Sequence, residues 1–101
     1  SDMRFKKNIV PLTDCIEKVC KLNGVSFDWD RENYPEKKFT VAPQIGCIAQ
    51  DVEAVVPEIV FTDNKGYKSM SYDKISALFI ECIKSQQKQI ESLQEQINKL
   101  S

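Results

Sequence analysis

Residues 73–101 read DKISALFIECIKSQQKQIESLQEQINKLS and contain neither proline nor glycine. Because both helix breakers are missing, this stretch predicts one uninterrupted helix that Asp73 caps at its start. Apolar side chains recur every seven residues along it, with isoleucines at the a positions and mainly leucines at the d positions. The apolar seam consists of Phe79, Ile83, Ile90, Leu93, Ile97 and Leu100, and Gln86 is its one polar interruption.

Two interpretations of this seam compete. An amphipathic helix packed on its own domain explains residues 74–84. It does not explain the heptads beyond Gln86, because a chain of 101 residues has little surface left to bury them. A coiled coil is the better interpretation there, and its strand number stays open. Ile at a with Leu at d favours two helices, whereas uncharged glutamines at the e and g positions are compatible with a trimer.

Upstream of this helix, short patterned segments predict a mixed head. The expected elements are a helix over 14–22, strands over 25–30 and 44–48, a helix over 49–56 and a hairpin of 59–62 with 67–72. The first helix is expected to stop at Gly24, since glycine tolerates the left-handed conformation at a helix C-terminus. The fold class is therefore α+β, with a small globular head over residues 1–84 and a coiled-coil helix over residues 85–101.

Residues 30–44, DRENYPEKKFTVAPQ, interrupt the predicted strands. The segment is charged and carries two prolines, which predicts a long exposed loop or an irregular hairpin. Loops of this length are uncommon and often functional, so it is either a partner-binding arm or a tolerated insertion. Trp29, Tyr34 and Phe39 could form a binding patch, but a tryptophan on an alternating strand belongs more often to the core.

The composition excludes several function classes. Lys and Arg total 14 and Asp and Glu total 15, a balance that argues against a nucleic-acid binder or a polybasic membrane anchor. The chain has no histidine, which removes Ser-His-Asp triads and His-containing zinc sites. The four cysteines form no C-x-x-C pair and are expected to be reduced core thiols. We expect no cofactor and no metal, and no apolar run is long enough to span a bilayer.

The opening SDMRFKK, residues 1–7, holds one possible nucleophile and base. Without histidine, a serine hydroxyl needs another base such as a neutral lysine amine, and Ser1 and Lys6 are the candidates. A free lysine has a pKa of about 10.4, so a lysine base needs burial or neighbouring cations, here Arg4 and Lys7, to lower it. Taken alone the pairing is weak, because a frayed polar terminus explains the same residues.

The spacing of Ser1 and Lys6 restricts how they could meet. Five residues apart, they lie on opposite faces of a strand. On a helix they lie about 140° apart around the axis, with a rise of about 7.5 Å. A turn must therefore fold the segment back, or the pair must form between neighbouring chains. Either arrangement needs support from packing, which an assembled trimer would supply.

Four stretches together resemble a known family. They are SDMRFKKNIVPL (1–12), LNGVSFDW (22–29), IGCIAQDVEAVVPEIV (45–60) and YKSMSYDKISALFIECIK (67–84). In this order and spacing they are similar to the C-terminal intramolecular chaperone, auto-processing domain of phage tailspikes, endosialidases and tail or neck appendage proteins. A related domain occurs in the eukaryotic myelin regulatory factor.

The resemblance implies a function and a site. Domains of this family trimerise, help an upstream fibrous domain to fold and then cut themselves off with a Ser-Lys dyad. By position, Ser1 is the nucleophile and Lys6 the general base, while Asp2 and Arg4 also match the motif without a clear role. The chain, which begins at Ser1 and not at an initiator methionine, then corresponds to the released product.

The expected partners are two further copies of the chain and the upstream fibrous domain of the same precursor. Neither nucleic acid nor a membrane is expected. The expected location is the host cytoplasm during virion assembly, with removal from the mature virion protein. Two alternatives stay open: a trimerisation module without protease activity, and a receptor-binding tip that stays on the fibre.

Overall fold

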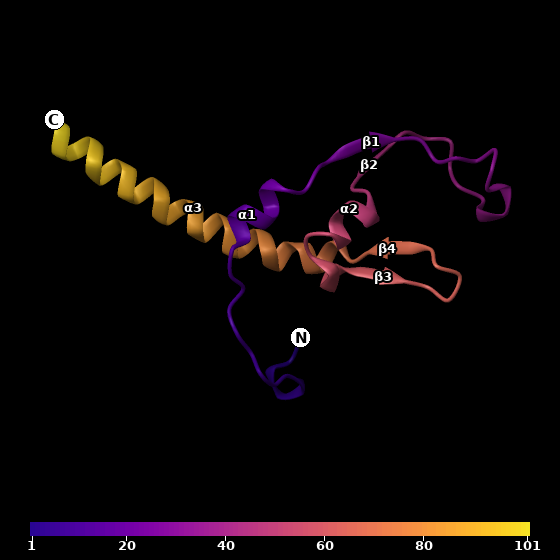
Figure 1. Ribbon diagram of the computed structural model, residues 1–101, viewed down its shortest axis with the longest axis horizontal. Coiled ribbons are helices and arrows are strands. Elements are labelled where there is room, and N and C mark those ends of the chain that lie inside the picture. Colours follow the sequence, from indigo (N-terminus) through magenta and orange to yellow (C-terminus); the bar gives the residue numbers. More distant parts are fainter. The chain divides into compact units, whose positions relative to one another are not determined.

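One helix, α3 (Tyr72–Leu100), contributes 29 residues to the chain (Figure 1). The structure is a computed structural model that describes all residues 1–101. The other elements are short: η1 (Met3–Phe5), α1 (Cys15–Cys20), β1 (Val25–Phe27), η2 (Pro35–Lys37), β2 (Gln44–Gly46), α2 (Ala49–Glu53), η3 (Pro57–Ile59), β3 (Val60–Thr62) and β4 (Lys68–Met70). The predicted mixture of helices and short strands with a long C-terminal helix is confirmed.

The chain contacts divide the molecule into two units, one formed by Ser1–Val19 with Asp73–Ser101 and the other by Cys20–Tyr72. The second unit contains two antiparallel ribbons. Strand β1 pairs with β2 so that Ser26 faces Ile45, and β3 pairs with β4 so that Phe61 faces Ser69. The predicted hairpin therefore exists, the two separately predicted strands pair with each other, and residues 28–43 form the long connection inside the first ribbon.

A small apolar cluster supports the second ribbon. Helix α2 contacts η3, β3 and β4. Val56 follows the end of α2 and its N–H donates to the Val52 carbonyl at 2.8 Å. Both valines are buried together with Ile59. Pro57 begins the next turn, η3, which leads directly into β3. The sequence around Pro57 thus builds a compact helix-turn-strand unit around Val52, the most buried side chain at 1% exposure.

The first unit is organised along α3. Ile75, Leu78 and Cys82 follow helical spacing and are buried, whereas every residue from Ile83 onward is exposed. The first turn of α1, with the buried Cys15, lies along α3 near Ser85 and Gln89 (Figure 1). Because burial ends before the second half of α3, this half presents its apolar side chains to solvent.

The end of α1 differs from the prediction. The helix ends at Cys20 and not at residue 22. Gly24 is not left-handed, so the predicted glycine stop is wrong; the positive-φ residues are Asn8, Asp14, Lys38 and Gly66. Asp14, at φ 56°, stands immediately before the helix. The chain therefore turns sharply into α1 and leaves it early, which sequence periodicity does not encode.

The cysteines are all free thiols, but they are not all core residues. Cys15 and Cys82 are buried and Cys47 is half-buried, as small apolar side chains often are. Cys20 is exposed, so the expectation of a core thiol is wrong there. None of the helices has both the length and the apolar composition that crossing a bilayer requires.

Candidate functional site

The N-terminal segment is folded back by one tight turn, η1. Asp2, the residue before the turn, has extended backbone angles and its carboxylate accepts a hydrogen bond from the Arg4 backbone N–H at 2.8 Å. Aspartate favours this capping position because a helical turn begins with N–H groups that lack partners. The Phe5 N–H donates to the Asp2 carbonyl and the Lys6 N–H to the Met3 carbonyl, which closes the turn.

This turn brings Lys6 back to Ser1. The Lys6 Nζ donates a hydrogen bond to the Ser1 carbonyl oxygen at 3.2 Å. The hydrogen bond joins the amine to the backbone of the residue that carries the candidate nucleophile. Of the two arrangements that the spacing allowed, the structure contains the turn within one chain. Both side chains are exposed in this single chain.

An ion pair lies beside this contact. The guanidinium of Arg4 reaches both carboxylate oxygens of Asp2, with Nε 3.1 Å from Oδ1 and Nη2 2.8 Å from Oδ2. The Arg4 side chain, and then its backbone N–H, lower the pKa of the Asp2 carboxyl below 3.8. The same side-chain hydrogen bonds raise the pKa of Arg4. Asp2 is thus charged at neutral pH, and the guanidinium engages both of its oxygens.

The seam residues of α3 have no cover within the chain. Their exposed fractions range from 40% for Phe79 to 89% for Leu100, and Ile83, Ile90, Leu93 and Ile97 lie between 57% and 65%. Isolated exposed apolar residues are ordinary on protein surfaces. A stripe of six along one helix is a larger patch, of the kind that marks an interaction surface.

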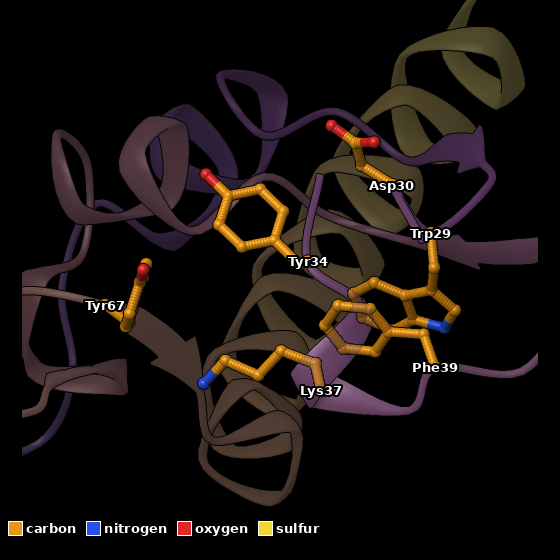
Figure 2. Close-up of a pocket in the computed structure, with 6 residues that line it drawn as sticks. All are labelled: Trp29, Asp30, Tyr34, Lys37, Phe39 and Tyr67. Atoms are coloured by element: carbon orange, nitrogen blue, oxygen red, sulfur yellow. The ribbon is translucent and has the colours of Figure 1, made fainter. Parts of the chain in front are cut away.

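A third feature is an aromatic pocket in the unit Cys20–Tyr72 (Figure 2). Its volume is about 370 Å³, and it is lined by Trp29, Asp30, Tyr34, Lys37, Phe39 and Tyr67. Trp29 and Phe39 stack face to face with centroids 4.3 Å apart. Trp29 is 38% exposed, so its expected place in the core is wrong, and the patch of Trp29, Tyr34 and Phe39 exists.

Tyr67 and Lys37 complete the pocket, and no sequence pattern predicted either residue. Tyr34 meets Tyr67 edge to face at 6.4 Å, and the Lys37 ammonium lies 4.7 Å from the Tyr67 ring centre. Tyr67 follows the turn between β3 and β4, where the Asp63 carboxylate accepts the Tyr67 N–H. The long loop is therefore held at its tip by the neighbouring hairpin and is not a free arm.

The structure offers no obvious metal centre. No group of three or more Asp, Glu or Cys side chains lies close enough together to hold a metal ion.

Comparison with known proteins matches residues 1–61 to the peptidase family described as the chaperone of endosialidase. The chain is also 38% identical over 66 residues to the long tail fiber protein Gp37 of Escherichia phage AR1, which covers 65% of this chain and 6% of that protein. It is 31% identical over 101 residues to Gp37 of Enterobacteria phage K3, covering 96% of the chain and 8% of that protein. For Enterobacteria phage Ox2 the identity is 30% over 97 residues, covering 92% of the chain and 38% of Gp37.

The chain thus spans only a small part of the tail fiber proteins that it matches. The family match covers more than half of the chain and includes the turn, Ser1 and Lys6, as well as most of the aromatic pocket. This chain belongs to the chaperone of endosialidase family.

Proposed function

We propose that this chain is an intramolecular chaperone that trimerises, assists the folding of a phage fibre domain upstream of Ser1, and then releases itself by cutting immediately before Ser1. Family membership and the tail fiber relatives support a chaperone role in fibre assembly. The observation that carries the cleavage step is the contact between Lys6 Nζ and the Ser1 carbonyl, made by the turn of η1.

In the proposed reaction, the Ser1 Oγ attacks the carbonyl carbon of the residue that precedes it. Lys6 accepts the hydroxyl proton as the C–O bond forms. The peptide C–N bond then breaks, and the Ser1 nitrogen takes the proton from Lys6 as it leaves. The resulting ester is hydrolysed by water, which frees the upstream carboxylate and restores the Ser1 hydroxyl. No cofactor is needed, and the reaction runs once per chain.

The exposed seam of α3 supports the trimer proposal. Residues 85–101 would form a parallel three-helix coiled coil, while residues 1–84 carry the chaperone and processing functions. The Ile and Leu positions alone favour two helices, so the choice of three follows the family. Assembly would also cover the apolar stripe, which is otherwise unpartnered.

The loop between β1 and β2 is the proposed contact with the folding client. It carries the aromatic pocket, whose largely apolar walls fit an apolar side chain of an extended segment. Its tip is fixed by Tyr34 and Tyr67, so a client would meet a preformed surface. Such a surface binds with a smaller loss of conformational entropy than a free loop does.

The decisive experiment is cleavage of a precursor in which the chain follows its natural upstream fibre. Ser1→Ala and Lys6→Ala precursors should stay full length on a denaturing gel. Lys21→Ala is the matched control, because this lysine is also exposed and lies outside the N-terminal segment. Normal cleavage of the Lys6→Ala precursor would remove Lys6 from the mechanism.

Two other functions remain to be distinguished from this one. A trimerisation module without protease activity would leave the wild-type precursor uncut. A receptor-binding tip would stay on the mature fibre, whereas the proposed chaperone acts in the host cytoplasm during assembly and is absent from finished particles. Mass spectrometry of purified particles separates these cases.

A further inference from the structure

The Asp2 carboxylate accepts hydrogen bonds from both the backbone and the side chain of Arg4. We propose that Asp2 and Arg4 are positioning residues for self-cleavage: their forked ion pair closes the η1 turn that carries Lys6 to Ser1. This inference rests on the proposed function and assigns roles to the two motif residues for which the sequence offered none.

Without the Asp2–Arg4 pair, the η1 turn would be weak. Helix η1 is a three-residue 3-10 turn with no buried residue. Only the Phe5-to-Asp2 and Lys6-to-Met3 backbone bonds close it, at 3.2 and 3.0 Å. A single exposed turn of this kind is marginally stable in water, because the conformational entropy lost on fixing its backbone outweighs the free energy gained from so few hydrogen bonds. The bonds between Asp2 and Arg4 supply additional closure.

The Asp2–Arg4 pair also has a defined geometry. Arg4 presents Nε and Nη2 to the two carboxylate oxygens, and its backbone N–H points to Oδ1 at 2.8 Å. A planar fork fixes direction as well as distance, which a single charged contact does not. Lys6 lies two residues beyond Arg4, so the orientation of Arg4 sets where the Lys6 side chain starts.

The Asp2 carboxylate is suited to positioning and not to catalysis. Both oxygens of Asp2 are engaged by Arg4, and Arg4 lowers the pKa of the carboxyl. A charged carboxylate is a poor second base when both of its oxygens already accept hydrogen bonds, here from Arg4. The pair is also exposed, at 81% for the Arg4 side chain and 40% for that of Asp2. Exposed ion pairs add little to global stability, so its loss should affect cleavage and not folding.

The test measures the first-order cleavage rate of the precursor. Asp2→Ala and Arg4→Ala should each slow cleavage by about 10- to 100-fold, the range expected when a catalytic group is misplaced by about 1 Å. The double variant should be no slower than either single variant, because both remove the same clamp. Arg4→Lys, which keeps the charge and loses the fork, should recover only part of the rate. Met3→Ala, in the same turn and 75% exposed, is the control and should cleave normally.

The pH–rate profile excludes a merely electrostatic effect. If the pair acted only through charge, Asp2→Ala would free a cation and Arg4→Ala would remove one, so the midpoint of the pH–rate profile would move in opposite directions. Positioning predicts lower rates with the same midpoint in both variants.

A carboxyl-carbon NMR titration tests the ion pair between Asp2 and Arg4 directly. The pKa of Asp2 should lie below 3.8 in the wild-type chain and rise towards that value in Arg4→Ala. Because the folded pKa is lowered, the contribution of the pair to the turn is complete above 3.8 and is lost as the pH falls through the folded value.

Wild-type cleavage rates in Asp2→Ala or Arg4→Ala would show that the Asp2–Arg4 pair does not position Lys6. If Lys6→Ala blocks cleavage in the same series, the proposed function stands and only this inference fails. If Lys6→Ala also cleaves normally, the dyad itself is wrong.

Discussion

Lys6 Nζ lies 3.2 Å from the carbonyl oxygen of Ser1 in the same chain. A regular strand or helix would keep these residues apart, and the η1 turn makes the contact. The contact is local, since only five residues of one chain build it. The proposed dyad would therefore form within each chain of an assembly.

A mixture of Ser1→Ala and Lys6→Ala precursors should remain uncut. Each chain would lack one member of its own dyad, and a dyad within one chain cannot be completed by a neighbour. Co-expression of the two precursors with differently sized tags reads the result on one gel. Cleavage of the Lys6→Ala chain in the mixture would mean that lysine reaches a serine of another chain.

Cleavage should depend on assembly. Replacing Ile90, Leu93 and Ile97 by Asp puts charges into the seam, where each lost Ile or Leu contact removes about 1.5–3 kcal/mol of burial. We expect a folded monomeric precursor that stays intact, because Lys6 is exposed in the single chain and would gain its packing only in the trimer. Ser92→Asp with Asn98→Asp, on the outer positions of the same helix, is the control. Wild-type cleavage rates in the monomer would disprove the coupling.

Removal of residues 87–101 should weaken assembly and leave the rest folded. The buried residues of α3 end at Cys82, so the deletion removes only exposed seam positions. Circular dichroism should show a cooperative thermal transition for the truncated chain, and light scattering should show loss of oligomer. Light scattering of the full chain fixes the stoichiometry, and a dimer mass would favour the simple Ile and Leu rule.

Phe39→Ala should lower the yield of folded upstream fibre. The substitution removes the ring that stacks on Trp29 at 4.3 Å and opens one wall of the pocket. The matched control is Phe61→Ala, at an exposed position of β3 that does not line the pocket. Equal yields for both variants, measured as protease-resistant fibre, would indicate that the loop is a tolerated insertion.

Gly46→Ala should destabilise the unit Cys20–Tyr72. An added Cβ would lie 2.7 Å from the Tyr72 hydroxyl, which accepts the Cys47 N–H at 3.2 Å. Forcing this contact apart should cost about 1–3 kcal/mol, or a fall in Tm of roughly 4–8 °C for each kcal/mol.

Two variants control this prediction. Gly24→Ala should be close to neutral, since nothing lies within 4 Å of its added Cβ. Tyr72→Phe removes the clashing oxygen, so the Gly46→Ala loss should be smaller in that background. An equal loss in both backgrounds would place the strain elsewhere.

The sequence alone predicted the parts of the fold that depend on local pattern. Alternation predicted strand β1, the two short segments 59–62 and 67–72 predicted the β3–β4 hairpin, and the unbroken segment after Tyr72 predicted α3. The pairing of β1 with β2 was not predicted. The early end of α1 was missed, because helix ends depend on packing as well as on the presence of a glycine.

The candidate site divides in the same way. Ser1 and Lys6 were predicted from the sequence through the family resemblance, since the pairing of a serine with a lysine is weak evidence by itself. The turn that brings these two residues together is closed by Asp2 and Arg4. It depends on hydrogen bonds that the residue spacing alone does not predict. The aromatic pocket is the feature whose identification depended most on the tertiary structure. Tyr34 and Tyr67 are 33 positions apart in the sequence and meet only because two separate ribbons place them together. Periodicity reports the face on which a side chain lies within its own element, whereas contacts between elements depend on how their faces pack.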